Sequence, residues 1–254
     1  MRWHGILAVV FSVLAALAWS DVGSAQEWGD LSGTFVFKGS PPTPTKIAPT
    51  KDQEVCGKVM LVDEALVVNK ENNGIQNVVV YLADTAKPKI HADYEATAKS
   101  EVVLDNANCR FEPHVQGIRV GQTLIIGNKD PVGHNTKADF FSNTPFNDLI
   151  PATGQVKKTF AKAEGQPSPI SCSIHPWMTG YLLIREDPYF AISDKDGKFT
   201  IKNLPAGEHT FVVWSNKFIS NVSVDGKATT WARGRVKMNI KAGQNSLGKV
   251  EVTP

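Results

Sequence analysis

The chain has 254 residues and a formal net charge of +2, with 27 Lys and Arg against 25 Asp and Glu. This near balance, without a basic cluster, argues against nucleic acid as the main partner. The length suits one large domain or two small ones.

An apolar run near the N-terminus indicates the compartment in which the protein works. Residues 5–19 are almost wholly apolar, follow Arg2 and His4, and lead into small residues that end at Ala25. A charged start, an apolar stretch and small residues at the end are typical of a secretory signal peptide, and the run is too short for a spanning helix. We expect residues 1–25 to be cleaved near Ala25, an uncleaved anchor being the alternative. The mature chain, without a membrane span, would be periplasmic or secreted.

Short β-strand patterns dominate the next part of the chain. β-branched and aromatic residues alternate with Gly, Pro and Asn turn signals, and a helix is indicated only over residues 92–100. A Pro-rich stretch over 41–49 separates the first strand from the rest. The expected strands in this part are 33–38, 65–68, 77–82, 122–126 and 181–184. Many short strands with this punctuation predict an all-β fold of the sandwich type.

A change of composition after Arg185 indicates a second unit. The strands expected there are 189–192, 198–201, 208–214, 236–240 and 249–252, with turns at Gly197 and Gly207 between them. We therefore predict one domain over residues 26–185 and a second, smaller β-sandwich over residues 186–254.

Three cysteines in an exported chain leave one without an internal partner. Cys172 is the one surrounded by residue types that bind metals. We therefore expect a disulfide between Cys56 and Cys109 and a free thiolate at Cys172. The alternative pairs Cys172 with one of the other two.

The loop Cys172-Ser173-Ile174-His175-Pro176-Trp177-Met178 carries a thiolate, an imidazole and a thioether. With a second imidazole from His134, this is the ligand set of a type 1 copper site, two His and one Cys with a weak axial Met. Three alternatives exist. A Cys–His pair can act as nucleophile and base, but that leaves Met178 unexplained. A zinc site would prefer more Cys or His and no Met. Met178 alone is often core filler.

One mononuclear copper in this ligand set would cycle between Cu(I) and Cu(II) with little movement of its ligands. Asn135, next to His134, is expected to support the site from outside the ligand shell. Pro176 stiffens the loop by fixing its backbone. No His-x-His pattern is present for further copper ions. The sequence therefore predicts an electron carrier and not an enzyme.

Several segments between Asn108 and Arg185 resemble the cupredoxin family of amicyanin-like and plastocyanin-like blue-copper proteins. They are Phe111-Glu112-Pro113, Val120-Gly121-Gln122-Thr123, Gly127-Asn128-Lys129-Asp130, Gly133-His134-Asn135 and Cys172-x-x-His175-x-x-Met178. The resemblance implies a Greek-key β-sandwich with copper held by His134, Cys172, His175 and Met178. It also implies that electrons reach redox protein partners through an exposed port formed by His175, Pro176 and Trp177.

The rest of the chain adds to this resemblance. Residues 194–214 resemble a carboxypeptidase regulatory-like, or transthyretin-like, β-sandwich, which is usually non-catalytic. The two-part arrangement is similar to bacterial methylamine-utilisation-like proteins. Residues 26–108 are more than a minimal cupredoxin needs, and we expect them to add strands to its sandwich or to form a small module stapled by a disulfide. Two alternatives to electron transfer remain, a copper-handling protein and an extracellular interaction module.

Overall fold

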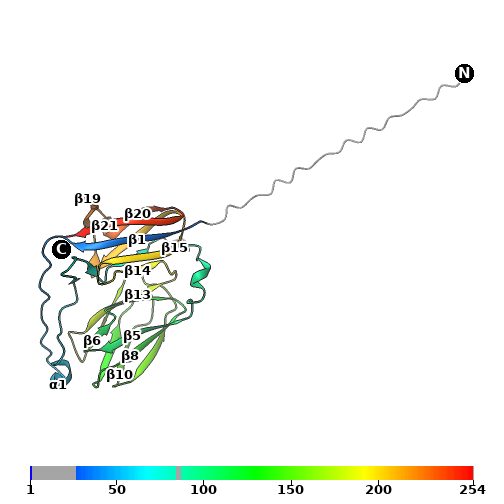
Figure 1. Cartoon of the computed structure of the whole chain (residues 1–254). Helices are drawn as coiled ribbons and strands as arrows, with labels where there is room; N and C mark the ends of the chain where they lie inside the picture. Colours follow the sequence, from blue (N-terminus) through cyan, green and yellow to red (C-terminus); the bar gives the residue numbers. More distant parts are fainter. Residues whose placement is uncertain (2–26, 84–86, 254) are drawn as a thin grey trace.

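The computed structural model describes Met1 and residues 27–83 and 87–253. The predicted signal peptide therefore lies outside the described residues, apart from Met1. Within the described part of the chain, no helix is long and apolar enough to cross a membrane. Strands make up most of the regular structure, and the predicted all-β fold class is confirmed (Figure 1).

Two sheets form the first sandwich, and their inner faces share one apolar core that includes Leu31, Phe35, Val80, Phe211 and Val250. One sheet has the order β15-β1-β21-β18-β19, and the other has the order β14-β4-β16-β17, with β20 also paired to β16. The strands are β1 (Trp28–Phe37), β4 (Val79–Leu82), β14 (Phe190–Ile192), β15 (Lys198–Pro205), β16 (Gly207–Ser215), β17 (Lys217–Phe218), β18 (Asn221–Val224), β19 (Lys227–Thr230), β20 (Arg235–Ile240) and β21 (Gly243–Val252).

This sandwich is built from both ends of the chain, which corrects the predicted division at residue 185. β1 lies between β15 and β21, antiparallel to the first and parallel to the second, and β4 lies between β14 and β16. Segment 26–185 is therefore not one contiguous domain, and its first strands do not extend the cupredoxin-like sandwich. Without β1, both β15 and β21 would have an unpaired edge in the middle of the sheet, which is costly in a buried sheet.

A continuous stretch in the middle of the chain forms the second sandwich. One sheet has the order β10-β9-β12-β13-β7 and the other the order β11-β8-β5-β6, around a core that includes Leu104, Phe111, Ile126, Leu182 and Ile184. The strands are β5 (Glu101–Ala107), β6 (Arg110–Glu112), β7 (Val115–Arg119), β8 (Thr123–Asn128), β9 (His134–Ala138), β10 (Phe146–Ile150), β11 (Gln155–Thr159), β12 (Ser168–Ser171) and β13 (Thr179–Arg185).

The two sandwiches share an apolar junction, which explains why strand β4 does not alternate apolar and polar side chains. In β4, Val80 and Leu82 face the first core, whereas Val79 and Tyr81 face a cluster that also holds Leu183 of β13. Since successive side chains of a strand point to opposite faces, a strand buried on both faces reads as a continuous apolar run. The Val-Val-Val-Tyr-Leu sequence at 78–82 is the result.

An arm formed by residues 38–66 leaves the first sandwich and returns to it. Its two legs pair at Lys46 and Val62, and its tip carries the short helix α1 (Gln53–Cys56). Figure 1 shows the arm running beside the second sandwich down to α1. The remaining elements are β2 (Val67–Val68), β3 (Ile75–Gln76), and the 3-10 turns η1 (Ala92–Tyr94) and η2 (Ala232–Gly234). The helix expected over 92–100 is thus a single turn.

The pairing of β1 with C-terminal strands predicts that a core substitution in β1 destabilises the C-terminal part of the chain. Phe35 is fully buried and stacks on Phe199 of β15 with ring centroids 5.3 Å apart. We expect Phe35→Ala to lower the free energy of unfolding by about 3–5 kcal/mol and to accelerate proteolysis within residues 186–254. The exposed Lys198→Ala serves as control, with a change within about 0.5 kcal/mol. Unchanged proteolysis of residues 186–254 in the Phe35 variant would contradict this pairing.

Candidate metal centre

The Cys172 loop folds back on itself so that its His approaches its Cys. The Cys172 N–H donates to the Met178 carbonyl at 3.2 Å, and the Met178 N–H donates to the His175 carbonyl at 2.9 Å. The His175 N–H donates to Cys172 Sγ at 3.4 Å, and His175 Nδ1 lies 3.8 Å from the same sulfur. The loop between β12 and β13 is therefore closed by its own backbone, and this closure places imidazole and sulfur side by side.

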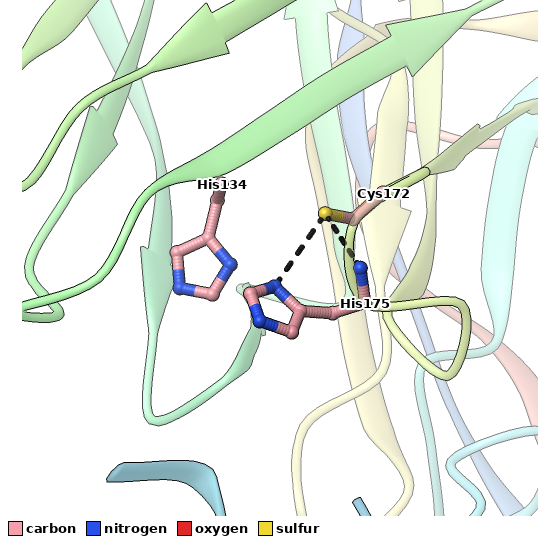
Figure 2. Close-up of side chains that lie close together, drawn as sticks. All are labelled: His134, Cys172 and His175. Atoms are coloured by element: carbon pink, nitrogen blue, oxygen red, sulfur yellow. Dashed lines mark hydrogen bonds between the residues drawn. The ribbon is translucent and has the colours of Figure 1, made fainter. Parts of the chain in front are cut away.

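His134 reaches the same place from the start of β9. β9 pairs with β12, with Ser171 opposite Lys137, and this register brings the two strand ends together. One donor atom each from His134, Cys172 and His175 lies within 4.8 Å of the other two, and all three residues are buried. Figure 2 shows both imidazoles turned toward the sulfur. The structure thus brings His134 to the Cys172 loop, and the role of the three residues as metal ligands stays a prediction.

Asn135 holds the loop in place, as expected of a residue next to His134. Its backbone N–H donates to Cys172 Sγ at 3.5 Å, and its Oδ1 accepts from the N–H groups of Ser173 at 2.7 Å and Ile174 at 3.2 Å. The sulfur thus accepts from two backbone N–H groups, those of Asn135 and His175. These donors stabilise a thiolate at a fixed position.

Each imidazole is held from outside by a carboxylate. His134 Nε2 lies 2.8 Å from Asp130 Oδ2, and His175 Nε2 lies 2.7 Å from Asp52 Oδ2. A carboxylate can only accept, so each Nε2 carries a proton and each Nδ1 is left to face the sulfur. His134 Nδ1 is buried and has no hydrogen-bond partner among the described residues. A buried imidazole nitrogen without a partner, aimed at a thiolate and a second imidazole, fits a metal ligand.

The charges of this cluster are coupled. Burial lowers the pKa of His134, but the Asp130 hydrogen bond and the nearby Cys172 sulfur outweigh it and raise that pKa to about 9. Burial raises the pKa of the Cys172 thiol, but His134 and the backbone N–H donors lower it below its usual value. Burial lowers the pKa of His175, since the hydrogen bond to Asp52 only partly opposes it. The two pKa values are thus shifted in opposite directions, that of His134 upward and that of Cys172 downward, and both groups must lose their protons to bind a metal.

The disulfide Cys56–Cys109 is present, with Cα atoms 5.6 Å apart, and Cys172 is the free, buried cysteine. The expected pairing is confirmed. The disulfide also excludes a competing metal cluster, because Cys109 lies close to Asp130 and His134 but its sulfur is covalently occupied.

The remaining predicted residues of the loop are placed as follows. Met178 is 1% exposed and packs in the same apolar cluster as Cys172, and its role as axial ligand stays a prediction. Pro176 is exposed, and Trp177 is half-buried, with its ring centroid 5.1 Å from that of His175. His175 is fully buried, so the expectation that it forms an exposed port at the surface is wrong. The physical reason is the arm, whose Asp52 lies over its outer nitrogen.

Sequence reasoning missed both carboxylates. Asp130 stands four residues before His134 in a turn, and this proximity was a usable signal for a supporting partner. Asp52 is 123 residues away from His175, and no local pattern connects the two.

No protein-family model and no curated protein matches this sequence. Matches among solved structures include cupredoxins and a copper-containing enzyme. A copper-containing nitrite reductase from Thermus scotoductus SA-01 is 23% identical over 41% of this chain, with a TM-score of 0.31. The match covers 25% of that enzyme, so this chain spans only a quarter of its length.

Two smaller proteins are matched over nearly their whole length. A purple cupredoxin from Nitrosopumilus maritimus is 22% identical over 34% of this chain and 99% of its own, with a TM-score of 0.28. The Cu(I) form of the M98A mutant of amicyanin is 18% identical over 41% of this chain and 97% of its own, with a TM-score of 0.30.

The Asp130–His134 contact predicts a pH effect in the metal-free protein. The folded pKa of about 9 for His134 exceeds its usual 6.5, so its stabilisation is complete below pH 6.5 and is lost as the pH rises through 9. In Asp130→Asn, we expect the His134 pKa, followed by NMR, to fall well below 9. The free energy of unfolding at pH 7 should fall by about 1–3 kcal/mol.

Asp139→Asn is the control, because Asp139 forms an exposed pair with Lys137. It should leave both the His134 titration and the stability unchanged. A His134 titration in Asp130→Asn identical to that of the wild type would contradict the role given to Asp130.

Proposed function

We propose that this protein is an exported type 1 copper protein that transfers single electrons between redox protein partners. The observation that carries the proposal is the convergence of His134, Cys172 and His175, whose donor atoms lie within 4.8 Å of one another in a buried site. Their outer nitrogens are already bonded to carboxylates, so the inner donors are free for a metal.

The chemistry of the donors favours copper over zinc. Structural zinc sites take four ligands drawn from Cys and His, whereas this cluster offers one thiolate and two imidazoles. A nearby buried thioether, that of Met178, suits copper and is foreign to zinc. A catalytic Cys–His pair is disfavoured as well, because the thiol is only 2% exposed and a substrate could not reach it.

Bound copper would supply a one-electron couple between Cu(I) and Cu(II). The chain's own residues keep that couple from requiring movement. Asn135 and the His175 N–H hold the sulfur, Asp130 holds the His134 ring, and Asp52 holds the His175 ring. Ligands fixed in this way have the same positions in both redox states, which lowers the reorganisation that electron transfer requires.

A second candidate function is copper holding without electron transfer. It is favoured by one observation, the complete burial of His175 beneath Asp52. The two functions differ in redox behaviour. A carrier exchanges electrons reversibly at an electrode without losing copper, whereas a holding protein either loses copper when its redox state changes or does not exchange electrons.

The proposal predicts a coloured copper protein. Mature wild-type protein given Cu(II) should bind one equivalent and develop an intense thiolate-to-copper visible band, and Cys172→Ser should abolish the band. Ser171→Ala, one residue earlier at the end of β12, is the control and should keep it. A wild-type protein that remains colourless and binds no copper would refute the proposed function.

The role of Met178 as an axial ligand is tested separately. The substitution Met178→Leu replaces the thioether by a hydrocarbon side chain. It removes a weak donor that helps to stabilise Cu(II). We expect the visible band to persist and the reduction potential, measured by voltammetry, to rise. A potential equal to that of the wild type would show that Met178 is core filler and not a ligand.

A further inference from the structure

The arm of residues 38–66 covers the outer side of the metal centre. Its tip is fixed to the second sandwich by the Cys56–Cys109 disulfide and by the apolar cluster of Cys56, Leu61 and Cys109, against which Trp177 also packs. Nearer its base, Glu64 lies 3.8 Å from the Arg110 guanidinium. The arm is therefore held against the second sandwich by specific contacts.

Asp52 is the group of the arm that contacts the centre. Its carboxylate lies between solvent and the fully buried His175 ring, with 40% of the Asp52 side chain exposed. The Asp52 backbone is left-handed, with φ of 47°, and its carbonyl accepts from the Val55 and Cys56 N–H groups of α1. A left-handed backbone at a non-glycine residue is unfavourable and is retained where the surroundings determine it. Here α1 and its disulfide determine where the carboxylate lies.

The same disulfide also organises the carboxylate of the other imidazole. The Cys109 and Asn108 N–H groups each donate to Asp130 at 2.8 Å, and Asp130 in turn holds His134. One covalent link therefore connects the positions of Asp52, on one His, and Asp130, on the other.

We propose that residues 46–62 are a lid over the metal centre, in which Asp52 is a positioning residue for His175 and the Cys56–Cys109 disulfide keeps the lid closed. This inference rests on the proposed function in that it takes His175 as a metal ligand. The lid must open for a metal to enter or leave, because His134, Cys172 and His175 are all buried when it is closed. A redox partner therefore contacts the surface of the lid and not an exposed edge of the His175 imidazole.

The experiment uses the mature, metal-free chain, with its disulfide intact in every variant except the one that removes both of its cysteines. Cys172 is then the sole thiol, because the other two of the three cysteines are bonded to each other. Its rate of reaction with Ellman's reagent reports opening of the lid, since local opening controls access to a buried group. Circular dichroism confirms that each variant remains folded.

We expect Asp52→Ala to raise this rate by about tenfold or more, since a hydrogen bond to a charged group is lost. The double variant Cys56→Ser/Cys109→Ser should raise it at least as much. Asp52→Asn should stay near the wild-type rate, because its amide oxygen still accepts from His175 Nε2 and Asn tolerates a left-handed backbone. Glu54→Ala, an exposed charge removal in the same helix, is the matched control and should leave the rate unchanged. Equal rates in the wild type, Asp52→Ala and the double variant would overturn the lid.

A parallel measurement follows copper. In wild type loaded with Cu(II), transfer of copper to an added chelator should be slow, and Asp52→Ala should speed it about tenfold while keeping the visible band. If the wild type binds no copper, the proposed function fails, and the thiol rates still decide whether the lid exists. If copper binds but Asp52→Ala changes neither the rate of the thiol reaction nor the rate of copper release, the proposed lid is refuted and the proposed copper site is retained.

Discussion

Burial of polar donors is the constraint on which the rest of this structure depends. Two imidazoles and a thiol are placed at the end of an apolar core, where each polar atom needs a partner. The chain meets this need with Asp130 and Asp52 on the outer nitrogens and with backbone N–H groups on the sulfur. What remains without a partner is His134 Nδ1, on the inner side of the cluster. The pattern of satisfied and unsatisfied atoms thus marks the position that a metal would take.

The arrangement of the chain explains how Asp52 comes to this position. The cupredoxin-like sandwich is a continuous stretch, whereas the first sandwich is assembled from both ends of the chain, with β1 between β15 and β21. The arm leaves at the end of β1 and returns at β2, so it belongs to the first sandwich and reaches over the second. The shared apolar junction at Val79, Tyr81 and Leu183 holds the two sandwiches together. The first sandwich therefore anchors an arm whose Asp52 contacts the candidate metal centre of the other.

Much of the site could be predicted from the sequence because its signals are local. The spacing of Cys172, His175 and Met178 fits within one loop, and the odd number of cysteines pointed to Cys56–Cys109, which the structure contains. Other features carried no local signal. The strand pattern of β1 is the same whichever sheet it joins, so its partners among C-terminal strands were mispredicted. The exposure of His175 was mispredicted for a related reason, since the group that covers it comes from a distant segment.

The sequence by itself determined the class of fold, the residues proposed as metal ligands and the disulfide. These follow from residue types and short spacings, which set strand periodicity, loop closure and cysteine chemistry. The tertiary structure alone decided that the chain's two ends share one sandwich and that both imidazoles rest on carboxylates. It also decided that the cluster of His134, Cys172 and His175 lies beneath an arm. These depend on contacts between residues as far apart as Asp52 and His175, which form only when the hydrophobic cores and their junction bring distant segments together.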